Sequence, residues 1–321
     1  MKTPRPLPLN NLLLLLAAAL PLASGCTTVA PRPLAPNIVA GQHLTILSPA
    51  GQPLLRYQLA PPAETKLSIQ TAGFFHPLTT PAGHPLTALA PADHLHHRGL
   101  FLAFVEMHGA DDADFWGWGA HAPTNGRQIV NQSLTHTPFT THEARFEARN
   151  HWIAGETVLL RETLEARLEV RKTLHLLDLT YTLTPESDLT LSRWAFGGFC
   201  LRLRNDGPLE YRSPSGTPSH ANPNHMKPET DWPDQPWYAA LITLKEGTKV
   251  GGAVINHPQN PATLWHNHPS TYMINPCITA PTELKWAKGQ PITLKYRVAT
   301  FDDTFPTHDL NTLAEEWAAT P

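Results

Sequence analysis

Short apolar runs, separated by turn residues, follow one another along the chain from residue 38 onward. Many alternate apolar and polar side chains, and Pro and Gly recur between them, which is typical of strands in a β-sheet. Residues 161–168 have some helix propensity, but their Thr and Val content and the continuing alternation favour a strand. The predicted strands span residues 38–40, 43–47, 54–59, 67–70, 128–134, 140–148, 158–166, 168–176, 179–184, 189–193, 199–204, 237–244, 249–255, 263–265, 270–274 and 292–298.

The last segment has a helical period instead. Leu310, Leu313, Ala314 and Trp317 fall at i, i+3, i+4 and i+7, and either Thr307 or Asp309 can cap the segment. No internal repeat and no second hydrophobic block is evident. The pattern predicts an all-β fold, a large antiparallel β-sandwich with one short C-terminal helix, forming a single domain over residues 38–321.

Two stretches are too polar and too broken to be strands. Residues 108–127 hold three aspartates, two tryptophans and several glycines, and residues 213–236 are rich in Pro, Ser, Asn and His. Both are predicted to be long loops. Long loops in compact domains are usually functional.

The most distinctive stretch is residues 93–105, in which a polar cluster runs directly into an apolar one. Three histidines, an aspartate and an arginine precede a segment that is apolar on both faces, as in a strand buried on two sides. Alternation would place His94, His96 and Arg98 on one face if the strand began at Asp93, but Pro91 favours a later start. A charged cluster at the mouth of a buried strand indicates a site.

Composition excludes some partners. The chain has 41% apolar and 16% charged residues and a formal charge of −3, so it can bury a large core. No basic block is present, which argues against a nucleic-acid surface. Its 33 prolines disfavour long helices.

The first 26 residues are typical of an export signal. Lys2 and Arg5 precede an apolar segment at residues 12–22 that is too short to span a bilayer, and small residues lead to Cys26. This resembles a bacterial lipoprotein signal in which Cys26 is lipidated, with a Pro- and Ala-rich tether at residues 27–37. We expect an exported protein anchored by lipid at the outer membrane or the periplasmic face; a plain secretory signal is the alternative.

Two cysteines remain, Cys200 and Cys277. An oxidising compartment permits a disulfide between them, but both fall in segments that resemble core strands, where free cysteine is common.

Several short motifs follow one another along the chain. They are His76-Pro77-Leu78, Asp93-His94-Leu95-His96-His97-Arg98-Gly99-Leu100, Asp114-Phe115-Trp116, Gly126-Arg127-Gln128-Ile129-Val130, Gly197-Gly198-Phe199-Cys200-Leu201-Arg202-Leu203 and Asn275-Pro276. Over residues 44–302 they resemble a PmoA-like family of secreted bacterial proteins. The resemblance implies the galactose-mutarotase-like superfamily, whose supersandwich fold serves aldose epimerases, polysaccharide lyases and glycosidase domains. This chain departs from the family pattern at Leu95, Phe101 and Gly117-Trp118, which replace a proline, a tryptophan and a His-Glu pair.

These features favour a saccharide site. A neutral histidine can exchange protons with a sugar, and tryptophan faces can stack on its C–H groups. The predicted catalytic residues are His97, His76 and Arg98, and the predicted substrate-binding residues are Asp93, Asp114, Trp116 and Arg127.

Other interpretations of the cluster remain open. His94 and His96, two residues apart, can share a metal ion if Asp93 or His76 supplies a third ligand. Alternatively, the histidines only brace a loop. The corresponding functions are a carbohydrate-active hydrolase, lyase or epimerase, a non-catalytic saccharide-binding lipoprotein, and the metal-dependent oxidoreductase that the family label suggests. No other cofactor is expected, the membrane is contacted through the lipid alone, and the oligomeric state is open.

If Cys26 is lipidated, Cys26→Ser should move the protein from the membrane fraction into the periplasm or the medium, because the acyl chains supply its membrane affinity. Fractionation followed by immunoblotting checks this. Unchanged membrane association of the variant would contradict it.

Overall fold

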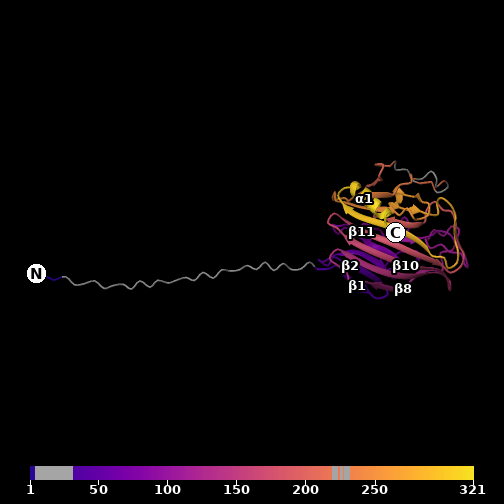
Figure 1. Ribbon diagram of the computed structural model, residues 1–321, viewed down its shortest axis with the longest axis horizontal. Helices are drawn as coiled ribbons and strands as arrows, with labels where there is room; N and C mark the ends of the chain where they lie inside the picture. Colours follow the sequence, from indigo (N-terminus) through magenta and orange to yellow (C-terminus); the bar gives the residue numbers. More distant parts are fainter. Residues whose placement is uncertain (4–31, 219–222, 225–226, 228–231) are drawn as a thin grey trace. The chain divides into compact units, whose positions relative to one another are not determined.

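Two sheets pack against each other and enclose the main hydrophobic core (Figure 1). The computed structural model describes residues 1–3, 32–218, 223–224, 227 and 232–321. Residues 32–321 form one compact unit. Cys26, the rest of the expected signal from residue 4 onward and residues 27–31 of the expected tether lie outside the described residues.

The first sheet has seven strands in the described part of the chain. In spatial order they are β1 (Ala35–Val39), β2 (His43–Leu47), β3 (Pro53–Gln58), β5 (Phe74–Leu78), β6 (Leu100–Ala103), β13 (Gly198–Arg202) and β18 (Met273–Ile274). All neighbours in this sheet are antiparallel.

The second sheet has nine strands among the described residues. In spatial order they are β14 (Leu209–Arg212), β15 (Trp237–Thr243), β16 (Lys249–Asn256), β21 (Ile292–Asp302), β11 (Leu174–Pro185), β10 (Thr157–Val170), β9 (Glu143–Ala154), β8 (Arg127–His136) and β4 (Gln70–Thr71). The β4–β8 pair is parallel and the other pairs are antiparallel.

Small ladders complete the described part. One joins β20 (Leu284–Trp286), β12 (Leu189–Leu191) and β7 (Met107–His108), and another joins β17 (Leu264–Trp265) and β19 (Pro276–Cys277). A short 3-10 turn, η2, spans Pro269–Thr271.

Strict alternation explains why β9 and β10 are strands despite their helix-forming residues. In β9, Phe146 and Trp152 are buried while Arg145 and Arg149 point to solvent. Phe146 lies opposite Ala166 of β10, so the inward side chains of both strands face the same core. A period of two places every second residue on one face of a sheet, which a helix cannot do.

The outer face of the second sheet carries helix α1 (Thr307–Ala318), which has its own apolar cluster. Leu310, Leu313 and Trp317 pack there together with Trp237 and Phe301. The expected all-β sandwich with one C-terminal helix is confirmed.

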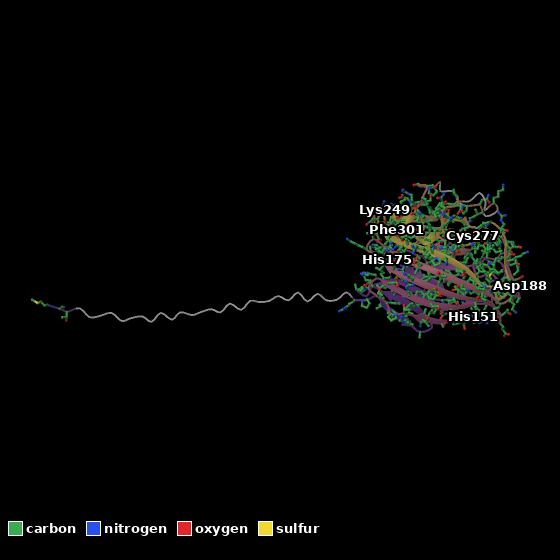
Figure 2. The ribbon with its side chains drawn as sticks, viewed as in Figure 1. His151, His175, Asp188, Lys249, Cys277 and Phe301 are labelled. Carbon is green, nitrogen blue, oxygen red and sulfur yellow. The ribbon has the colours of Figure 1, made fainter. Side chains whose placement is uncertain are left out.

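One detail differs from expectation: strand β1 begins at Ala35, inside the stretch expected to be a tether, and the preceding Leu34 is buried. Strand β6 begins at Leu100, in line with the later start that Pro91 favours, so Asp93 to Arg98 form a loop and do not alternate across a sheet. Cys200 and Cys277 are both buried free thiols. Figure 2 labels Cys277. Among the described residues, no helix is long and apolar enough to cross a membrane.

A carboxyl group lies inside the main core. Glu162 of β10 is 3% exposed and accepts hydrogen bonds from Asn150 Nδ2 at 2.7 Å and Trp152 Nε1 at 2.8 Å. Burial raises the pKa of Glu162 to about 7, against the two hydrogen bonds, which favour the carboxylate.

The folded state should therefore become less stable as the pH rises from about 4.5 to about 7. In the unfolded chain the Glu162 carboxyl group ionises above about pH 4.5, whereas in the folded protein it keeps its proton up to about pH 7. Between these two pH values, ionisation therefore stabilises the unfolded state relative to the folded state. We expect the free energy of unfolding to fall by about 3 kcal/mol over this window, in addition to other groups. Glu162→Gln, which cannot ionise, should abolish this component of the slope, as measured by urea unfolding across the window.

The matched control is Glu165→Gln, whose side chain points to solvent from the same strand. It should keep the slope of the unmodified protein. An unchanged slope in Glu162→Gln would contradict the prediction, whatever the baseline stability of that variant.

Candidate functional site

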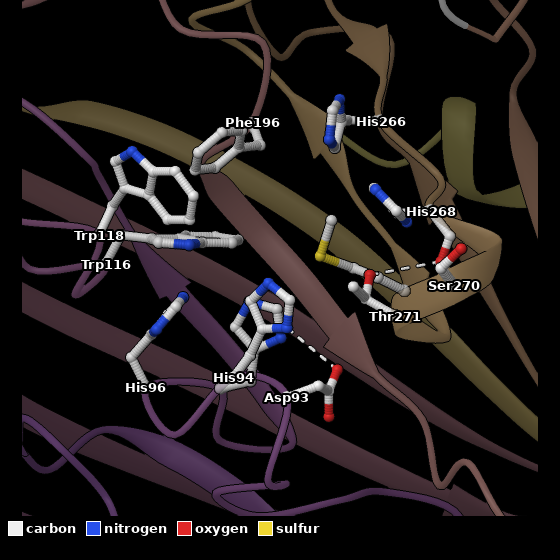
Figure 3. A pocket seen from close by; sticks show the side chains of 12 residues that line it. Asp93, His94, His96, Trp116, Trp118, Phe196, His266, His268, Ser270 and Thr271 are labelled. Carbon is white, nitrogen blue, oxygen red and sulfur yellow. Dashed lines mark hydrogen bonds and ion pairs between the residues drawn. The ribbon is translucent and has the colours of Figure 1, made fainter. Parts of the chain in front are cut away.

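A cavity of about 400 Å³ opens where the loop before β6 meets the segments that precede β13 and β18 (Figure 3). Its lining includes five histidines, one carboxylate, three aromatic side chains and a methionine. The lining residues are Asp93, His94, His96, His97, Trp116, Trp118, Phe196, His266, His268, Ser270, Thr271 and Met273.

Asp93 is held at the cavity edge by a buried arginine. Arg202 of β13 is fully buried, and its Nη2 lies 2.9 and 2.7 Å from the two carboxylate oxygens of Asp93. Burial alone would raise the pKa of Asp93, but the hydrogen bonds from Arg202 and His94 outweigh it and lower this pKa. Asp93 is therefore a fixed carboxylate.

His94 takes its orientation from Asp93. Its Nδ1 lies 3.0 Å from Asp93 Oδ2 (Figure 3). Because an ionised carboxylate can only accept, Nδ1 carries a proton, and the other ring nitrogen, Nε2, lies on the side of the ring away from Asp93.

His97 is held in the opposite tautomer. Arg202 Nη1 lies 3.3 Å from His97 Nδ1, and a guanidinium can only donate, so Nδ1 accepts and the proton is on Nε2. Burial lowers the pKa of His97 well below its usual value, with His96 and Arg202 adding to the effect, so the ring is neutral. The His94 and His97 rings stack 4.7 Å apart at 18°. The cavity thus holds a proton acceptor and a proton donor in adjacent rings.

His96 is 9% exposed, and its Nε2 is buried without a hydrogen-bond partner among the described residues. Burial, with the neighbouring His94 and Arg98 adding to the effect, lowers the pKa of His96 to about 3. Its close packing requires a glycine: a Cβ on Gly117, which has a φ of +105°, would lie 2.5 Å from the His96 Cβ.

The aromatic wall differs from expectation. Trp116, predicted to be the platform, is 1% exposed, whereas Trp118 is 44% exposed and lines the same cavity. Phe196 lies beside both, with its ring 5.8 Å from Trp116 and 5.3 Å from Trp118. Trp118 is therefore the indole that a ligand can contact most readily.

Asp114, expected to bind substrate, instead holds the loop together. Its carboxylate oxygens accept from the backbone N–H groups of Gly117 at 2.7 Å and Gly119 at 2.6 Å. Burial raises the pKa of Asp114 to about 6, against these hydrogen bonds. It does not line the cavity, and its contribution is to position the tryptophans.

Arg98, predicted to be catalytic, makes similar supporting contacts and does not line the cavity. Its fully buried guanidinium donates to the backbone oxygens of Phe115 at 3.0 Å, His96 at 3.2 Å and Trp116 at 3.4 Å. It ties the histidine loop to the tryptophan loop from behind.

Two other expected site residues lie away from the cavity. His76 bonds through Nδ1 to Thr87 Oγ1 at 2.9 Å, and Arg127 bonds to Asp111 at 3.0 Å and to the backbone oxygen of Asp112. Neither lines the cavity. Burial lowers the pKa of His76 to about 4.

Sequence reasoning missed three contributors to the site: Arg202, Phe196 and the pair His266 and His268. Arg202 falls in one of the motifs quoted above, which was the available signal. His266 and His268 have the same two-residue spacing as His94 and His96. Their proximity to the cluster depends on β18 pairing with β13.

The described side chains around the cavity do not form a metal-binding ligand set. In the described part of the chain, no group of three or more His, Cys, Asp or Glu side chains is arranged to hold a metal ion. His94 Nδ1 and both Asp93 oxygens are already engaged with protein groups.

Comparison with solved structures gives only distant similarities. The galactosidase domain of the α-galactosidase–sucrose kinase AgaSK is 9% identical, with a TM-score of 0.42, over 83% of this chain and 41% of that one. A galactose mutarotase related enzyme from Lactobacillus acidophilus is 7% identical, with a TM-score of 0.35, over 84% of this chain and 97% of that one. The α-galactosidase AgaA from Geobacillus stearothermophilus is 7% identical, with a TM-score of 0.35, over 84% and 39%.

This chain thus spans less than half of the two galactosidase chains. At these TM-scores the similarities carry no argument about chemistry. No curated protein matches the chain.

A family model matches residues 46–315, which include every cavity residue. The PmoA-like label stays a prediction, because the matched model does not carry it. The chain belongs to the family of unknown function DUF6807.

Proposed function

We propose that this protein is a carbohydrate-active enzyme that binds a neutral saccharide in the histidine cavity and moves a proton on it. The observation that carries the proposal is the pair of stacked rings, His94 and His97, held in opposite tautomers beside the exposed Trp118. A proton acceptor, a donor and an aromatic platform together suit a polyhydroxylated ring.

The lining supports a neutral ligand over an ionic one. Asp93 is the one carboxylate among the described lining residues, and Arg202 balances its charge. His96 and His97 are neutral because burial lowers their pKa values. Trp118, Phe196 and Met273 offer apolar surface to sugar C–H groups.

The proposed mechanism gives each side chain a separate role. His94 Nε2 accepts a proton from the bound sugar, and Asp93 stabilises the imidazolium that forms. His97 Nε2–H donates a hydrogen bond to an oxygen on which negative charge develops. Arg202 holds both Asp93 and His97, so it is a positioning residue.

This arrangement favours an epimerase type of reaction over hydrolysis and over a lyase reaction. In an epimerase reaction, His94 removes a proton from the carbon next to the carbonyl group of the open-chain sugar, and a proton is then returned to that carbon. A lyase reaction removes a proton beside a carboxylate, which a neutral sugar lacks. Glycoside hydrolysis commonly needs two carboxyl groups facing the same bond, and the described lining has one. Removal of a proton by His94, with stabilisation of the resulting charge by His97, needs no second carboxylate.

A non-catalytic saccharide-binding protein is the second candidate. It is favoured by the lowered pKa values of His96 and His97, which keep both rings neutral near pH 7, so that neither can act as a general acid by giving up a second proton. Either function would be located on the exported side of the membrane, with Cys26 as the proposed lipid anchor.

The reaction can be tested without knowing the product. A proton removed from carbon in D₂O is replaced by deuterium, so a panel of neutral mono- and oligosaccharides can be followed by NMR. We expect His94→Ala to lower exchange about 100-fold or more while affinity changes little, because the base acts on the transition state. His97→Ala should also lower exchange, with affinity largely kept.

The control is His136→Ala, an exposed histidine that does not line the cavity. It should leave exchange and affinity unchanged. Binding without exchange in the unmodified protein would favour the second candidate, and parallel loss of melting temperature and affinity in His97→Ala would indicate a bracing role.

A further inference from the structure

The aromatic wall of the cavity continues beyond its mouth. The Phe196 ring lies 5.3 Å from Trp118, which lines the cavity, and 5.7 Å from Trp194, which does not. The ring of His121 lies a further 5.0 Å from Trp194. Trp194 is partly exposed and His121 is exposed, so the row leads from the cavity to the surface.

Trp194 is held in a fixed orientation. Its Nε1 donates to Glu106 Oε2 at 2.7 Å, and Glu106 Oε1 lies 2.8 Å from His108 Nε2. His108 Nδ1 lies in turn 2.9 Å from Asp112 Oδ1. Since the polar atom of the indole is already bonded, its remaining surface is apolar, and little side-chain freedom is left to lose when a ligand binds.

Core packing alone does not explain this arrangement. Trp116 and Trp152 are 1% and 0% exposed, whereas Trp118 and Trp194 keep part of their surface in solvent on either side of the buried Phe196. The two partly exposed indoles contact the same buried ring, so both lie beside Phe196 at the mouth of the cavity. Exposed aromatic surface next to a cavity is typical of a binding site.

We propose that the ligand is an oligosaccharide, with one sugar unit in the histidine cavity against Trp118 and a further unit on an outer subsite formed by Trp194 and His121. The inference rests on the proposed function and specifies its substrate class. The cavity supplies the chemistry, and the outer subsite selects chains over single sugars.

The test compares chain lengths. Binding of gluco-, galacto-, manno- and xylo-oligosaccharides of one to about six units is measured by calorimetry on the full-length protein. In the unmodified protein, affinity should rise from one unit to the next as the chain reaches Trp194. Trp194→Ala should remove this gain, roughly five- to tenfold, the change expected for contact with one aromatic ring, while affinity for the single sugar is kept.

Two further variants keep the test decisive. His121→Ala changes an exposed side chain and should reduce the same gain even if Trp194→Ala does not fold. Phe139→Ala removes another partly exposed ring, one that contacts His136 and no residue of the row, and should keep the full gain.

The outcomes separate this inference from the proposed function. One outcome contradicts the outer subsite alone. Single sugars bind and Trp118→Ala weakens their binding, but affinity still rises with chain length in both Trp194→Ala and His121→Ala. The outer subsite is then wrong and the cavity function stands. If no saccharide of any length binds to the unmodified protein, both are wrong. A rise of affinity with chain length that is lost in Trp194→Ala and His121→Ala but kept in Phe139→Ala supports the outer subsite.

Discussion

The guanidinium of Arg202 is fully buried, and the carboxylate of Asp93 at the edge of the cavity balances its charge. A buried charge without its partner is strongly destabilising, so the loop that carries Asp93 is held against β13. The same guanidinium donates to His97, while Asp93 accepts from His94. One ion pair therefore sets the proton positions on two histidines as well as the position of their loop.

The rest of the site is held by hydrogen bonds between side chains and backbone. Arg98 donates to backbone oxygens of the histidine and tryptophan segments, and Asp114 accepts from backbone N–H groups of the tryptophan loop. Both side chains are buried and neither lines the cavity. Loops fixed in this way can present a preorganised site without being part of a sheet.

Phe196 links the cavity to the outer surface. Its ring contacts Trp116, Trp118, Trp194 and His266, so it joins the tryptophan loop to the segment that precedes β18. It immediately precedes Gly197 and Gly198, both with positive φ, where the chain turns into β13. The position of this ring follows from the course of the backbone there, and the orientation of the neighbouring indoles follows from their contacts with it.

The sequence by itself determined the architecture. A two-residue alternation in β9 and β10 and a helical period at Leu310, Leu313 and Trp317 depend on side chains a few residues apart, so they can be read without knowing the fold. The clustering of His94, His96 and His97 also located the cavity. What the sequence did not determine was where each predicted site residue lies: Arg98, Asp114 and Arg127 do not line the cavity.

Those positions depend on groups far away in the chain. Arg202 is 109 residues from Asp93 and 105 from His97, and no local pattern indicates that its guanidinium reaches both. Trp116 and Trp118 are two residues apart, yet one is buried and the other exposed, because Phe101 and Phe196 pack around the first. Only the tertiary structure decided which histidine accepts a proton, which donates one and which indole a ligand can reach, because each depends on a partner brought close by strand pairing.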